Sequence, residues 1–154
     1  MNLAIVGATG NVGRKILEVL EKKKLYIDNL YLLASSKSAG SKINFLGNEY
    51  EVLDLENFDF SNVKITFFAA GGKISENFAE KAAKHSFVID NSSFYRMDPD
   101  VPLVVPQVNS DHLNNIKKNI IANPNCSTAQ LVIALKPLHD LFIIKRIVVS
   151  TYQS

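Results

Sequence analysis

The single cysteine of the chain stands where a nucleophile could work. Cys126 follows Asn123-Pro124-Asn125 and lies between an apolar run at 120–122 and a helical pattern that begins near Ser127. Asn125 or Ser127 can cap this helix. A helix N-terminus stabilises negative charge, so a cysteine in this position favours the thiolate, which is the nucleophilic form. We therefore predict a covalent nucleophile, with an inert buried cysteine as the alternative.

A glycine-rich segment predicts a dinucleotide site. Gly7-Ala8-Thr9-Gly10-Asn11-Val12-Gly13 directly follows an apolar run at 3–6 and opens a helical pattern. Glycines in this context permit a tight turn, close approach to a pyrophosphate and close packing of the helix on the sheet. The N–H groups at the start of the helix can bind the phosphates. The same turn also occurs without a ligand, but the flanking strand and helix favour a dinucleotide.

The loop after the second apolar run bears on the choice of cofactor. NAD-binding domains usually place Asp or Glu here to bind the ribose 2′-hydroxyl. This chain has Ala34-Ser35-Ser36-Lys37-Ser38-Ala39-Gly40, which supplies hydroxyl groups and a cation but no carboxylate. Such a loop suits a 2′-phosphate, so the sequence favours NADP over NAD. An ordinary polar loop is the alternative.

Two further loops follow predicted strands and lie on the same side of the sheet. Ala69-Ala70-Gly71-Gly72 would let backbone approach a ligand in the crevice, although a plain turn is nearly as good an interpretation. Arg96, in the segment 91–98, could hold a phosphate or carboxylate through its planar fork. A surface arginine paired with Asp98 is the simpler interpretation of that residue.

Apolar runs and helical patterns alternate along the chain, which predicts a parallel sheet in a doubly wound α/β fold. Continuous rather than alternating hydrophobicity indicates strands that are covered on both faces. The helical patterns between them complete βαβ units. Predicted strands are 3–6, 30–34, 65–69, 87–90, 120–122 and 143–149. Predicted inward-facing helix residues are Val12, Ile16, Leu17 and Leu20, then Phe78, Ala79, Ala82 and Ala83, and finally Leu131, Val132 and Leu135 of a helix over 127–139.

Composition excludes several other classes of protein. The 154 residues carry a net charge of +2, which is too balanced to indicate a nucleic-acid partner. No apolar run approaches the ~18 residues of a membrane span. One cysteine excludes a disulfide framework and a cysteine-based zinc site and favours a reducing cytoplasm. The three histidines share no metal-binding or catalytic spacing. A chain that stops on an apolar strand also suggests a fragment.

Five segments together resemble aspartate-semialdehyde dehydrogenase, in the same order and at similar spacing along the whole chain. They are Gly7–Gly13, Ala34–Gly40, Asn91-Ser92-Ser93, Asn123–Thr128 and Ser150–Ser154. The first motif by itself is shared with epimerases and other reductases. The related N-acetylglutamyl-phosphate reductases have a glycine immediately before the cysteine, where this chain has Asn125.

The resemblance implies a role for each matching residue. Cys126 would form an acyl thioester, Arg96 would bind inorganic phosphate or the phosphoryl group, and Gln153 would hold the substrate. Ala70 would lie against the cofactor, NADP. The remaining cofactor-binding residues would be Gly7, Thr9, Gly10, Asn11 and Val12 at the pyrophosphate, and Lys37 and Ser38 at the 2′-phosphate.

The resemblance also implies an activity. The family reversibly converts 4-phospho-L-aspartate and NADPH into L-aspartate 4-semialdehyde, phosphate and NADP, in lysine, methionine and threonine biosynthesis. Its members are much longer, and the additional part carries a second domain with a catalytic histidine, a substrate-binding arginine and most of the dimer interface. Residues 1–154 would then be a truncated NADP-binding domain of a cytoplasmic homo-oligomer, inactive by itself.

Two residues depart from the family pattern. Lys37 stands where arginine is usual, which keeps the charge but loses the planar fork, and Gln107 stands where glutamate is usual. The alternative function is a non-catalytic nucleotide-binding fragment or remnant of the enzyme. An epimerase-like enzyme is a third hypothesis. The lack of a recognisable Tyr-x-x-x-Lys pair in the chain counts against it.

Overall fold

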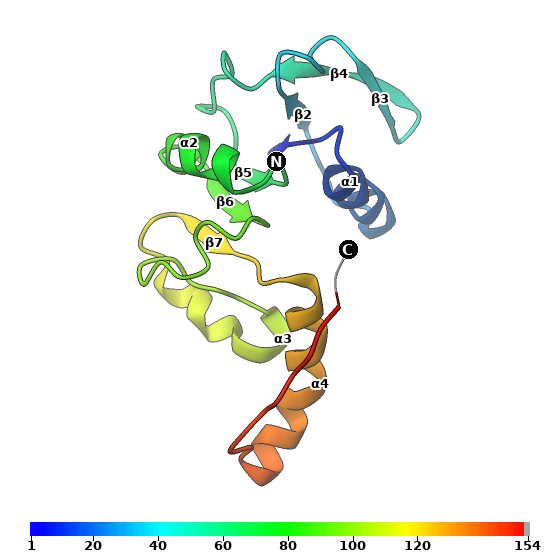
Figure 1. Cartoon of the computed structure of the whole chain (residues 1–154). Helices are drawn as coiled ribbons and strands as arrows, with labels where there is room; N and C mark the ends of the chain where they lie inside the picture. The colour runs from blue at the N-terminus through cyan, green and yellow to red at the C-terminus, as the bar shows by residue number, and fades with distance from the viewer. Residues whose placement is uncertain (153–154) are drawn as a thin grey trace.

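The computed structural model describes residues 1–152 and contains a seven-stranded sheet (Figure 1). The strand order is β3-β4-β2-β1-β5-β6-β7, and every neighbouring pair is parallel except β3 with β4. The predicted doubly wound α/β fold is therefore confirmed. The strands are β1 (Asn2–Val6), β2 (Asn29–Ala34), β3 (Lys42–Phe45), β4 (Asn48–Asp54), β5 (Ile65–Phe68), β6 (Phe87–Asp90) and β7 (Ile120–Ala122). The helices are α1 (Asn11–Lys23), α2 (Gly72–Ala83), α3 (Pro106–Asn109), a 3₁₀ helix (Ser110–Asn115) and α4 (Cys126–Phe142).

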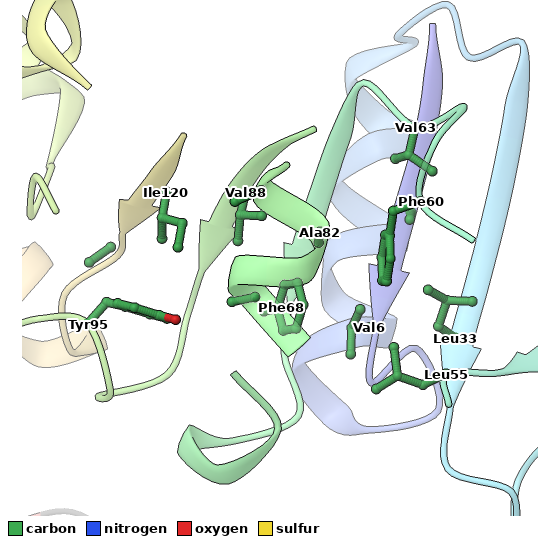
Figure 2. Close-up of a cluster of buried hydrophobic side chains, with 14 of the residues drawn as sticks. Val6, Leu33, Leu55, Phe60, Val63, Phe68, Ala82, Val88, Tyr95 and Ile120 are labelled. Atoms are coloured by element: carbon green, nitrogen blue, oxygen red, sulfur yellow. The ribbon is translucent and has the colours of Figure 1, made fainter. Parts of the chain in front are cut away.

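The central strands are buried on both faces because α1 and α2 cover opposite sides of the sheet. Alternate residues of a strand point to opposite faces. Leu3 and Ile5 of β1 accordingly belong to a core cluster that includes Leu17 and Leu20 of α1. Ala4 and Val6 belong to the other cluster, which includes Ala79 and Ala82 of α2 and is drawn in Figure 2. Two-sided burial explains why these strands read as continuous apolar runs.

The β3–β4 hairpin is absent from the sequence prediction, which assigns no strand between Gly40 and Ile65. The two strands pair from Phe45 opposite Asn48 outwards, so Leu46 and Gly47 form a two-residue loop. Both loop residues have positive φ, 51° and 80°, as tight hairpin turns of the primed type require. The hairpin extends the sheet beyond β2, and β4 pairs with β2 in parallel. It therefore brings the end of β4 to the edge where the predicted binding loops lie.

The predicted strand over 143–149 is wrong. These residues have no regular secondary structure, and Val148 is 78% exposed. Ile143 adopts a left-handed conformation that ends α4, and its N–H donates to the carbonyl of His139. The segment then turns back along α4 (Figure 1) instead of lying beside β7. Its backbone consequently has no neighbouring strand with which to form a ladder.

The last helix is longer and less buried than predicted. α4 extends to Phe142 and contains no fully buried residue within the described chain. Leu131, Val132 and Leu135 are half-buried; Val132 and Leu135 line a groove beside Val108 of α3 and do not pack into the sheet core. An apolar stripe on a helix shows that one face is suited to packing but does not show which surface covers it. None of the helices in residues 1–152 is long and apolar enough to cross a membrane.

Candidate functional site

The turn between β1 and α1 brings backbone close to the neighbouring strands. Gly7 and Ala8 both donate their N–H groups to the carbonyl of Leu33 in β2, at 2.8 and 3.2 Å. Gly7 has φ +84°, and a Cβ there would lie 2.7 Å from the carbonyl oxygen of Ala69 after β5. The N-cap of α1 is Gly10, which has no capping side chain. This cradle and the uncapped helix start suit a phosphate group.

A pocket of about 360 Å³ opens beside this turn at the carboxyl ends of β1, β2, β4 and β5. Ligands of open α/β sheets bind in this kind of crevice. Its lining combines backbone, hydroxyl and carboxylate groups with apolar side chains. The polar lining residues are Gly7, Thr9, Gly10, Ser35, Ser36 and Glu56, and the apolar ones are Val6, Ala34, Leu55, Ala69, Ala70, Ile74 and Phe78.

The structure brings together some of the predicted cofactor residues and leaves others outside this lining. Gly7, Thr9, Gly10 and Ala70 line the pocket. Asn11 and Val12 form the first turn of α1, and they line an apolar groove with Phe67 instead. Their backbone still belongs to the helix start that a phosphate would approach.

Lys37 and Ser38 occupy the turn just beyond Ser35 and Ser36. Ser38 donates its N–H to the carbonyl of Ser35 at 2.9 Å, and Gly40 donates to Val52 of β4 at 2.8 Å. The first bond closes a turn within the loop, and the second attaches the far end of the loop to the sheet. Lys37 is exposed, whereas Ser38 is half-buried. Neither residue belongs to the lining of the pocket.

Arg96 connects two loops and is not paired with Asp98. Its Nε donates to the carbonyl of Asn123 and its Nη2 donates to the carbonyl of Asn91, both at 3.0 Å. Asp98 instead accepts from Lys118 at 2.9 Å, and this bond lowers the pKa of the Asp98 carboxyl. The simpler sequence interpretation, an Arg96–Asp98 pair, is therefore wrong. Asn123 also donates to the Asn91 side chain at 2.9 Å, so the two loops are joined twice.

Cys126 is the first residue of α4 and is exposed, so the buried alternative is wrong. The helix is capped by Asn125, whose Oδ1 accepts from the N–H of Ser127 at 3.0 Å and from its hydroxyl at 2.7 Å. The Cys126 thiol lies 3.9 Å from the same oxygen. The thiol thus sits at the N-terminus of a long helix, three residues after the Asn123 carbonyl that Arg96 holds. Gln153 lies outside the described residues.

Sequence reasoning missed the buried carboxylate that shapes the Arg96 loop. Asp90, at the end of β6, is fully buried and accepts from the Ser75 hydroxyl of α2 at 2.7 Å. It also accepts from the N–H and hydroxyl of Ser92, at 2.9 and 2.7 Å. An aspartate followed two residues later by serine is a local signal for such a turn. Its burial depends on α2, which the local pattern does not contain.

Comparison with known proteins identifies the domain. The family model described as the NAD-binding domain of semialdehyde dehydrogenase matches residues 2–116. The chain belongs to the semialdehyde dehydrogenase family. The aspartate-semialdehyde dehydrogenase of Aquifex aeolicus is 55% identical over 156 aligned residues, which cover 99% of this chain and 46% of that protein. The chain therefore spans about half the length of the curated relatives it matches.

Solved structures of aspartate-semialdehyde dehydrogenases have the same fold. The Vibrio cholerae enzyme II, complexed with ASA, superposes with a TM-score of 0.88 and 49% identity over 90% of this chain and 46% of that one. The Candida albicans enzyme, solved with NADP, has a TM-score of 0.75 and 30% identity over 92% of this chain and 48% of that one. In this semialdehyde dehydrogenase domain, the pocket, Arg96 and Cys126 all follow carboxyl ends of parallel strands.

Proposed function

We propose that the chain is the NADP-binding half of an aspartate-semialdehyde dehydrogenase that reductively dephosphorylates 4-phospho-L-aspartate. The observation that supports this most strongly is the junction of the Arg96 loop with the loop that leads into Cys126. It joins the loop of Arg96, a side chain that could hold an anion, to the loop that leads into the exposed Cys126, and both loops follow carboxyl ends of strands, as the pocket does. The semialdehyde dehydrogenase relatives, which match nearly the whole chain, support the same activity.

The residues around the pocket fit a dinucleotide. Gly7, Thr9 and Gly10 would hold the pyrophosphate together with the backbone of Asn11 and Val12, because the uncapped start of α1 offers N–H donors to an anion. Ala70 would lie against the cofactor. Lys37 and Ser38 would bind the 2′-phosphate by charge and hydrogen bonding, which favours NADP over NAD. The relative solved with NADP supports this choice.

The chain's own residues would carry the first chemical step. The Cys126 thiolate would attack the acyl carbon of the phosphorylated substrate, forming a C–S bond while the C–O bond to phosphate breaks. Arg96 uses two of its donors on carbonyl groups, and its fork would hold the departing phosphate. Gln153 would hold the substrate near the thiol. The nicotinamide cofactor supplies, when bound, the hydride that reduces the thioester.

The cofactor assignment is tested by calorimetric titration of the chain with NADP and NAD. NADP should bind more tightly, and Lys37→Glu should reverse the order by placing a like charge against the 2′-phosphate. Lys64→Glu is the matched control, because exposed Lys64 immediately precedes β5 and so lies at the amino ends of the parallel strands, away from the pocket. Equal affinities of the two cofactors for the wild-type chain would contradict the assignment of this loop.

The nucleophile assignment is tested by alkylation with iodoacetamide followed by intact-mass measurement. The native chain should take up one label at Cys126, because this side chain is exposed, and Cys126→Ser should take up none. Inorganic phosphate should slow the labelling if Arg96 holds an anion beside the thiol, and Arg96→Met should remove that protection. Labelling only after unfolding in urea would contradict the role of Cys126.

A non-catalytic nucleotide-binding domain is the second candidate function, because the chain spans about half the length of its relatives. General acid–base catalysis typically contributes ~10²–10⁴-fold to rate, and in this family the base comes from the second domain. We therefore expect nucleotide binding with negligible turnover in an NADPH-coupled assay of the 154-residue chain. We place the activity in cytoplasmic lysine, methionine and threonine biosynthesis, with a small-molecule substrate and phosphate and without nucleic-acid or membrane partners.

A further inference from the structure

The pocket beside the glycine turn contains one charged side chain, Glu56, among the described residues that line it. The same lining includes the apolar side chains of Leu55, Ile74 and Phe78. Glu56 follows β4, the strand that the hairpin adds next to β2. In the strand order β4-β2-β1, Glu56 follows the strand on the far side of β2 from the glycine turn after β1. A ribose links phosphate to base, so a dinucleotide with its pyrophosphate at that turn and its ribose at the 34–40 loop after β2 would place its base beside Glu56.

The position of Glu56 is set by the two residues that precede it. Leu55 donates its N–H to the carbonyl of Ala34 at 2.9 Å, and its side chain is 4% exposed. Figure 2 shows Leu55 next to Val6 and Leu33, near the ends of β1 and β2. Asp54 accepts from the Glu56 N–H at 3.1 Å, which closes a local turn. The backbone of Glu56 is therefore held beside the start of the 34–40 loop, while its side chain is exposed.

A carboxylate accepts hydrogen bonds and donates none. The edge of adenine carries an exocyclic amino group, whereas hypoxanthine carries a carbonyl oxygen at the same position. We propose that Glu56 selects adenine by accepting a hydrogen bond from that amino group. This inference rests on the proposed function, because it requires that the pocket bind a dinucleotide. A hypoxanthine dinucleotide would lose the bond and place its carbonyl oxygen against the carboxylate.

The inference is tested by titrating the chain with NADP and with nicotinamide hypoxanthine dinucleotide phosphate. A lost charged hydrogen bond at a solvent-accessible site corresponds to a preference for NADP of about tenfold. Glu56→Gln should reduce the preference to within about threefold, because an amide can present either an oxygen or an N–H to the base. Glu56→Ala should also reduce it, since alanine removes the acceptor.

The matched control is Glu51→Gln, which removes the same charge from an exposed position within β4. Glu51 lies roughly 16 Å from Glu56 along the chain, at ~3.3 Å per residue. It should retain the wild-type preference. The inference is overturned if the wild-type chain binds both dinucleotides equally, or if Glu56→Gln and Glu56→Ala keep the full preference. Failure of the wild-type chain to bind either dinucleotide would instead overturn the proposed nucleotide site, and the inference with it.

Discussion

Replacing Gly13 with alanine separates local preference from tertiary packing. Gly13 lies in the first turn of α1 and is buried. Alanine is the better helix former, by up to about 1 kcal/mol, so local propensity predicts that the variant is stabilised. The structure predicts the opposite. A Cβ at this position would lie 2.3 Å from the carbonyl oxygen of Gly7 and 2.7 Å from Cα of Ala8.

These neighbours are backbone atoms of the β1–α1 turn, which cannot move as a flexible side chain can. Gly7 and Ala8 are held by the Leu33 carbonyl. Relief of the clash therefore requires α1 to move away from β1 and to loosen the packing of Leu17 and Leu20. Overpacking of this kind costs about 1–3 kcal/mol, occasionally more. We expect a loss near the upper limit, about 3 kcal/mol.

The assay is urea unfolding followed by far-ultraviolet circular dichroism. With a denaturant slope of about 2 kcal/mol/M, a loss of about 3 kcal/mol lowers the midpoint by about 1.5 M. Gly10→Ala is the control, because the nearest atom to its Cβ is the Gly7 oxygen at 3.4 Å. It should change the free energy of unfolding by less than about 1 kcal/mol. A Gly13→Ala midpoint equal to or above the wild-type value would refute the packing argument.

Three further predictions follow from buried and exposed groups. Asp90→Ala should lower the free energy of unfolding by about 3 kcal/mol, because it removes the acceptor of buried donors on Ser75 and Ser92. Ser75→Ala removes only one donor and should lower it by about 1 kcal/mol. Burial raises the pKa of Tyr95 to about 12, so the folded state holds this proton more tightly than the unfolded state. This contribution to the free energy of unfolding should be complete below about pH 10 and should decline between about pH 10 and 12, as measured by urea unfolding at each pH. In Tyr95→Phe this pH dependence should be absent. Exposed apolar side chains such as Phe142, Ile147 and Val148 should cause self-association that light scattering detects. The double variant Ile147→Lys, Val148→Lys should reduce this self-association. A monomeric wild-type chain would contradict the argument from exposed apolar surface.

The parts of the site that depend on local chemistry could be predicted from the sequence. The glycine turn was found because the strand before it and the helix after it are contiguous with it in the chain. Cys126 was placed at a helix start because the capping residue Asn125 is its neighbour. The parallel strands were recognised because burial on both faces leaves an uninterrupted apolar run.

The rest depends on residues that are distant in the sequence. Glu56 lines the pocket beside the glycine turn only because β4 pairs with β2, and Asp90 is buried only because α2 packs over the end of β6. The hydrogen-bond partner of Arg96 likewise depends on a distant residue. Asp98 is closer along the chain but is paired with Lys118, and Arg96 donates to the carbonyl of Asn123 instead.

The predicted strand at 143–149 failed for the same physical reason. Apolar composition alone determined that this segment would be suited to burial, but a strand also needs a neighbour whose N–H and C=O groups it can pair with. Only the tertiary structure decided that the segment leaves α4 through the left-handed Ile143 and runs beside that helix. By itself the sequence determined the glycine turn after β1, the start of α4 and the two-sided burial of the central strands, because these are set by residues a few positions apart. The pairing of distant backbone and side-chain groups decided which of those features came together.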